Sequence, residues 1–367
     1  MQKKQRQPEF EILRIVAMLM IVCLHYLSKG GLLTEPYSEN ISLNGYIAWF
    51  VEAFCVVAVN IYVLISGYFG IGNNGSSVWK RIYNVWIKVI FYSVFVGIIF
   101  SVAAMFNIGD LEKPDIYKIF CYVFPIVTEH YWFATSYVIL CIFIPFINAG
   151  FEKLEKKDIE ILLGILLLVF CISKTVIPMQ LPWDKYGYDA FWFVTVYITG
   201  GYIKKFGIGF IKNKRTAFMV YAFSQLLVFV CFVALRQVYL STGMFNSMIS
   251  YSYSYNFLLC YTGAIGLFCL FDIYSKKQKN ISKNVPLCNL TTKLSGATFG
   301  VYLIHEHIDI RGLWGIFVDS DTLLRGSSFV FILNLIVTVF IVYAACTFIE
   351  LLRQTIGEKI EKLRKHK

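Results

Sequence analysis

The sequence predicts an all-α fold, a polytopic membrane bundle of about ten transmembrane helices with both termini in the cytoplasm. Hydrophobic residues make up 57% of the 367 residues, charged residues only 16%, and the mean hydropathy is +0.63. Soluble domains contain about 25% charged residues, so this composition is typical of a membrane protein. We expect residues 1–367 to form a single integral-membrane domain embedded in a lipid bilayer.

Ten apolar stretches have the length that a membrane-crossing helix needs. The ninth is unusual because it carries five ionisable residues between His305 and Arg311. A shorter apolar piece, residues 117–127, is expected to be re-entrant or interfacial. The ten stretches are 11–28, 45–68, 82–106, 131–149, 159–177, 189–203, 216–236, 253–274, 296–317 and 328–352.

The positions of lysine and arginine predict which side of the membrane the termini face. With cytoplasmic termini, the cytoplasmic segments contain 24 of the 34 Lys and Arg residues, and Arg14, Lys88 and Lys174 lie inside the stretches. Cytoplasmic segments of membrane proteins are enriched in positive charge, so this orientation is favoured. The net charge of +11 then follows from topology and from attraction to anionic lipid headgroups, and we expect no nucleic-acid partner.

Cysteines and common motifs indicate no metal chemistry. Eight of the ten cysteines lie inside apolar stretches, and the chain has no CxxC pair. They are therefore interpreted as small core residues. We expect no metal site and no permanently bound cofactor.

Two ionisable residues lie deep in the first apolar stretch, Arg14 and His25. Eleven helical steps of about 100° make three turns plus about 20°, so Arg14, Met18, Ile21 and His25 share one face, spanning about 16 Å. Ionisable side chains at depth in a bilayer are rare and indicate a functional site. Taken singly, each has a simpler interpretation: Arg14 extends to the headgroups, and His25 ends the helix at the opposite interface.

Three more polar clusters lie near the ends of later stretches. One ends the second stretch, where a following basic pair makes it suitable for an anion, although an ordinary helix end has the same composition. The other two bring histidines to the middle or outer half of the membrane. The clusters are Asn60 and Ser66-Gly67-Tyr68-Phe69 with Lys80-Arg81, then Glu129-His130-Tyr131-Trp132-Phe133, and Tyr302-Leu303-Ile304-His305 with Glu306 and His307.

These motifs together resemble the acyltransferase type 3 family, membrane O-acyltransferases that modify bacterial surface polysaccharides. The resemblance rests on the spacing of Arg14 and His25, on the Ser66–Phe69 and Tyr302–His305 motifs, and more weakly on His130–Phe133. It implies ten spans with cytoplasmic termini in a bacterial cell membrane. This chain departs from many members at Tyr137, where they carry a glutamate.

The resemblance also implies substrates and roles. The donor would be acyl-CoA, with acetyl as the implied acyl group, and the acceptor a saccharide hydroxyl. His25 would act as the general base. His305 and His130 would orient the acceptor or stabilise the oxyanion. The phosphates of the donor would be bound by Arg14, Lys80 and Arg81, next to Ser66 and Gly67.

Two other classes of protein stay open at this point. A transporter or flippase of a lipid-linked glycan also needs intramembrane charges, which Arg14, Lys88 and the His305–His307 segment supply. A receptor or scaffold needs none of them. Binding of acyl-CoA distinguishes the enzyme from both, whereas the sequence does not indicate the oligomeric state.

Overall fold

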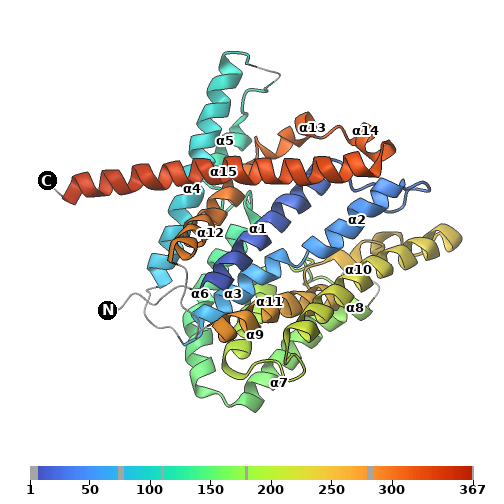
Figure 1. Cartoon of the computed structure of the whole chain (residues 1–367). Helices are drawn as coiled ribbons and strands as arrows, with labels where there is room; N and C mark the ends of the chain where they lie inside the picture. Colours follow the sequence, from blue (N-terminus) through green and yellow to red (C-terminus); the bar gives the residue numbers. More distant parts are fainter. Residues whose placement is uncertain (1–6, 73–77, 109–110, 178–180, 279–284, 366–367) are drawn as a thin grey trace.

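The computed structural model of the chain describes residues 7–72, 78–108, 111–177, 181–278 and 285–365 (Figure 1). Helices account for 79% of the protein, and the described residues contain no β-strand. The predicted all-α class is confirmed.

The helices follow one another in ten passages within the described ranges, where a passage is one helix or a series joined end to end. Between the passages lie three short α-helices, α5 (Ile116–Val123), α13 (Trp314–Phe317) and α14 (Ser320–Arg325), and three 3₁₀ turns, η2 (Asn246–Met248), η3 (Tyr251–Tyr253) and η4 (Arg311–Leu313). The ten passages are α1 (Pro8–Lys29), α2 and α3 (Leu43–Cys55 and Ala58–Gly70), α4 (Val78–Met105), α6 (Trp132–Lys153), α7, η1 and α8 (Lys156–Leu167, Leu168–Ile172 and Ser173–Val176), α9 (Ala190–Phe206), α10 (Lys214–Thr242), α11 (Leu258–Gln278), α12 (Val285–His305) and α15 (Ser328–Lys365).

Eight segments of the described chain are long and apolar enough to cross a membrane. The passages α9 and α12 are not among them. Phe95, Ile98 and Ile99 of α4 are half exposed or more, as lipid-facing side chains are. The chain is a multi-pass membrane protein, and the number of ten crossings stays a prediction.

Both ends of the described chain lie at one end of the bundle. The start of α1 and the end of α15 point to the same side in Figure 1. An even number of passages requires this arrangement. That this end faces the cytoplasm stays a prediction from the positive charges.

The ninth predicted span, 296–317, is displaced in the structure. The helix is α12, which begins at Val285 and ends at His305. Beyond it the Ile308 amide donates to Nε2 of His130 (2.9 Å) and not to a carbonyl one turn earlier. The chain therefore leaves the helix and continues as turns and short helices, because its polar residues bind partners outside α12.

The structure adds detail to two other predicted segments. The second span, 45–68, is two helices, α2 and α3, with turn residues at Val56 and Val57 between them. The apolar piece 117–127 contains α5, whose first turn is capped by Asp115 accepting from the Lys118 amide (2.7 Å). Whether α5 lies in the membrane interface stays a prediction.

Helices α3 and α9 cross at very short distance because glycines face the partner backbone. A Cβ atom added at Gly67 would lie 2.0 Å from the Tyr197 carbonyl oxygen, and one added at Gly200 would lie 2.3 Å from that of Leu64. Small residues allow such close helix approach in membranes. This crossing fixes α3, and with it one wall of the site described below.

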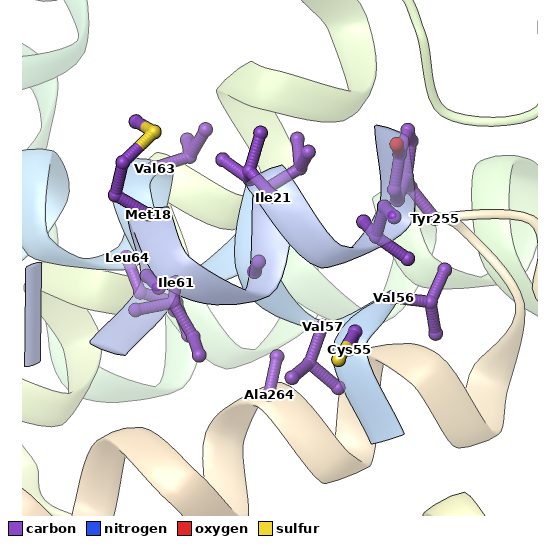
Figure 2. Close-up of a cluster of buried hydrophobic side chains, with 14 of the residues drawn as sticks. Met18, Ile21, Cys55, Val56, Val57, Ile61, Val63, Leu64, Tyr255 and Ala264 are labelled. Atoms are coloured by element: carbon purple, nitrogen blue, oxygen red, sulfur yellow. The ribbon is translucent and has the colours of Figure 1, made fainter. Parts of the chain in front are cut away.

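Helix α1 runs through the centre of the protein. Its apolar side chains pack into a buried cluster with α3, α11 and α12. Figure 2 shows Met18 and Ile21 of α1 in this cluster together with Val57 and Ile61 and with Ala264 of α11. The arginine and histidine of the first helix are therefore held on a helix fixed on several sides.

Candidate active site

A cavity of about 250 Å³ follows one face of α1. Arg14, Met18, Ile21 and His25 all line it, so the predicted common face is confirmed. The rest of the lining is mostly apolar and aromatic. It comprises Leu24 of α1 and, from other segments, Val59, Tyr62, Ser66, Val85, Trp132, Phe133, Tyr137, Tyr255, Ser295, Gly296, Thr298, Phe299 and Tyr302.

His25 forms a pair with His305 at one end of this cavity. Nδ1 of His25 lies 2.9 Å from Nε2 of His305, and Nδ1 of His305 lies 2.6 Å from the Val301 carbonyl oxygen. A carbonyl oxygen only accepts, so Nδ1 of His305 carries a hydrogen and its neutral ring accepts at Nε2. Nδ1 of His25 is then the donor, which leaves the lone pair of neutral His25 on Nε2.

Glu306 lies beside the same edge of the His25 ring. Its Oε2 is 3.3 Å from Nδ1 of His25, and the carboxylate side chain is only 6% exposed. Arg311 approaches the other carboxylate oxygen at 3.9 Å. Oε2 of Glu306 has no hydrogen-bond partner among the described residues, so the carboxylate lies beside the His25 ring without bonding to it, a placement that the sequence did not indicate.

Arg14 occupies the other end of the cavity. Its Nη1 atom contacts Oε1 of Glu11 at 2.6 Å, and its guanidinium lies 5.8 Å from the centre of the Phe69 ring. The arginine side chain keeps 26% exposure. A guanidinium has five N–H donors, so the contact with Glu11 leaves donors for an anion. Glu11, buried and bonded to Ser295, is a site residue that sequence reasoning missed, although its spacing of three residues from Arg14 is a usable signal.

The other predicted donor-binding residues divide into two groups. Ser66 lines the cavity, and its hydroxyl lies 3.4 Å from that of Tyr137. Gly67 faces α9 at the helix crossing and does not line the cavity. Lys80 and Arg81 stand in the first turn of α4 and do not line the cavity.

His130 is separate from the histidine pair. It does not line the cavity, and its ring stacks on Tyr131 with centroids 4.3 Å apart. Burial, with His307 and Arg311 nearby, lowers the pKa of His130 to about 3, so the ring stays neutral and accepts from the Ile308 amide. His130 therefore holds the segment that carries Glu306.

Asn60, another predicted polar residue, connects helices. Its side chain donates to the Tyr255 carbonyl (2.8 Å) and accepts from the indole of Trp192 (2.9 Å). Its amide is completely buried. Asn60 therefore links α3 to α9 and to the start of α11, and it does not face the anion end of the cavity.

Comparison with known protein families shows where the chain belongs. A family model described as an acyltransferase domain matches residues 7–351. The chain belongs to the acyltransferase type 3 family. No match was found among curated proteins or among solved structures.

Membership of the acyltransferase type 3 family agrees with the geometry of the cavity. Arg14, His25, Ser66 and Trp132, which come from three of the four motifs, line one space, and Tyr302 of the fourth motif joins them. The chain is thus a membrane acyltransferase, which favours the enzyme over the transporter and scaffold interpretations.

Proposed function

We propose that this acyltransferase moves an acetyl group from cytoplasmic acetyl-CoA to a hydroxyl of a cell-surface or lipid-linked saccharide, in the plasma membrane of a bacterium. One observation carries the proposal: a single narrow cavity has Arg14 at one end and the His25–His305 pair at the other. A cation at one end and a base at the other suit a donor with anionic phosphates and a distant reactive thioester.

The phosphates of the donor stay at the Arg14 end in this proposal. Arg14 binds them as a charge-assisted fork, and Lys80 and Arg81 raise the positive charge around the entrance. The apolar walls hold the pantetheine arm, which carries the thioester to His25 over about 16 Å. Glu11 orients Arg14 through its 2.6 Å contact.

His25 performs the proton transfer. The acceptor oxygen forms a bond to the thioester carbonyl carbon while Nε2 of His25 takes the hydroxyl proton. The tetrahedral intermediate then breaks its C–S bond, and the leaving coenzyme A thiolate receives that proton from His25. The products are the acetyl ester and free coenzyme A, and His25 returns to its neutral form.

His305 and Glu306 support this step from behind the His25 ring. Nε2 of His305 accepts the Nδ1 hydrogen at 2.9 Å, and Oε2 of Glu306 lies 3.3 Å from Nδ1 without a hydrogen bond. They favour the tautomer with a free Nε2 and stabilise the imidazolium that forms during attack. His130 acts at a distance by anchoring the Glu306 segment, and Tyr137 places a hydroxyl where other members carry a glutamate.

Glycan analysis in cells tests this function. We expect NMR spectra of surface glycans to lose O-acetyl signals when the gene is deleted, and to regain them with the wild-type chain but not with His25→Ala. Purified protein should bind acetyl-CoA in calorimetry. Unchanged glycans together with no binding of acetyl-CoA would refute the proposal.

A further inference from the structure

A second cavity, of about 630 Å³, lies at the end of the bundle that carries His25. It is built by the start of α6, the π-helix η1, the segment before α9 and the first residues of α9. Its lining comprises Glu129, Trp132, Thr135, Ser136, Ile139, Val169, Phe170, Trp183, Lys185, Tyr188, Asp189, Ala190 and Phe191.

The two cavities differ in volume, and a reaction with two substrates needs space for both of them. Binding sites for small molecules typically measure about 300–1,000 Å³. The first cavity, at about 250 Å³, lies below this range and suits a slender arm. The second cavity has the volume for one or more such rings.

The lining of the second cavity combines flat rings with charged groups. Trp132, Trp183 and Tyr188 provide aromatic faces, against which the C–H face of a sugar ring packs. Glu129 and Lys185 provide an acceptor and a donor for hydroxyl groups. A few polar groups among aromatic walls are typical of a site for a polyhydroxylated ligand.

Aromatic rings in contact with one another join the linings of the two cavities. Trp132 lines both of them, Tyr255 lines the first and Tyr188 lines the second. The Trp132 ring centre is 4.4 Å from that of Tyr188 and 5.7 Å from that of Tyr255, and the two tyrosines are 4.8 Å apart. A ligand in the second cavity therefore contacts the wall of the cavity that holds His25.

The backbone around the second cavity is irregular. Residues Leu168–Ile172 form a π-helix. This element is rare in proteins, and where it occurs it is often at a functional site. The Phe170 carbonyl of this turn accepts from the Asn256 side chain (2.8 Å). Glu129 has φ +53°, a strained conformation for a residue other than glycine.

We propose that the second cavity is the acceptor site and that it binds a saccharide stacked on Trp132 and Trp183. This inference rests on the proposed transfer from acetyl-CoA. The saccharide approaches the aromatic layer from the side opposite the donor, and displacement of the Trp132 ring brings its hydroxyl to His25. Donor and acceptor thus enter by different cavities.

The test uses membranes of the source cell that lack the native copy and carry a chosen variant, so that the endogenous acceptor is present. The membranes are supplied with [14C]acetyl-CoA, and labelled glycan is counted. Trp183→Ala is the informative variant because its ring is 55% exposed and lines only the second cavity. Trp79→Ala on α4 is the matched control, since Trp79 is 78% exposed and lines neither cavity.

We expect Trp183→Ala to lower glycan labelling about tenfold at limiting acceptor, which corresponds to about 1.4 kcal/mol, because the saccharide loses one of its two stacking rings. Trp183→Phe should restore most of it, and the Kd for acetyl-CoA should stay within about twofold of wild type. Label extracted into organic solvent identifies a lipid-linked saccharide, and label in water identifies a free or polymeric one.

Two results are decisive against the inference. Full labelling in Trp183→Ala would overturn the acceptor site, and so would a loss of labelling accompanied by an equal loss of acetyl-CoA affinity. Failure of the wild-type chain to label any glycan would instead contradict the proposed function itself, so the two failures are distinguishable.

Discussion

Replacing His25 by alanine removes the base of the proposed reaction. Loss of a general base typically lowers the rate by a factor of about 10² to 10⁴, or about 3–5 kcal/mol of barrier. The substitution also leaves Nε2 of His305 without its 2.9 Å donor, while the bond of His305 to Val301 remains. We therefore expect a folded protein that binds acetyl-CoA and has almost no transfer activity.

The structure also predicts the size of a smaller effect at His305. In His305→Ala we expect the Nδ1 hydrogen of His25 to turn to Oε2 of Glu306, which lies 3.3 Å away and has no hydrogen-bond partner among the described residues. One neutral hydrogen bond contributes about 1 kcal/mol, so the rate should fall about fivefold. Adding Glu306→Leu removes both acceptors, and the double variant should approach the loss seen in His25→Ala.

The assay measures transfer to glycan per folded molecule. Size-exclusion chromatography and thermal unfolding in detergent quantify folding, and calorimetry with acetyl-CoA measures donor binding. The control is Trp79→Ala, because Trp79 is 78% exposed and lines neither cavity. Its activity should follow the amount of folded protein.

Two results would refute this reasoning. A folded His25→Ala protein that keeps more than about a tenth of the wild-type turnover is incompatible with a general base at that position. A loss in His305→Ala as large as that in His25→Ala would make His305 the base.

Three further predictions concern the donor end, the fold and the topology. Arg14→Ala should weaken acetyl-CoA binding about 10- to 100-fold in calorimetry, and Arg14→Lys should restore it in part because a point charge replaces a planar fork; unchanged affinity would exclude the phosphate role. Gly200→Ala should destabilise the protein by about 1–3 kcal/mol in thermal unfolding, whereas Gly150→Ala, where the added Cβ meets nothing within 4 Å, should not; equal midpoints would contradict the close crossing. A compartment-sensitive reporter fused after Lys367 should be active only in the cytoplasm, and periplasmic activity would reverse the topology.

Features that depend on one helix could be predicted from the sequence. The common face of Arg14 and His25 follows from helical periodicity alone, and both residues line one cavity. The all-α class follows from composition and apolar length. Such predictions succeed because the necessary information lies within about one helix of sequence.

Features that depend on contacts between distant segments could not be predicted in this way. His25 and His305 are 280 residues apart, and no local pattern indicates that their rings meet. Gly67 indicates an anion site in the sequence because a residue without a side chain lets a ligand approach the backbone. In the structure, the missing side chain lets the α9 backbone approach instead. The end of α12 at His305 was missed because the tertiary bond between Ile308 and His130 decides it.

Helix α1 carries both reactive ends of the cavity on one continuous stretch of backbone. Substitutions between Arg14 and His25 alter the walls but leave the interval intact, whereas an inserted or deleted residue turns one end by about 100° relative to the other. The number of residues between Arg14 and His25 therefore fixes how the two ends of the substrate site are spaced and oriented. Variation in this enzyme should accumulate there as replacements of side chains and not as changes in length.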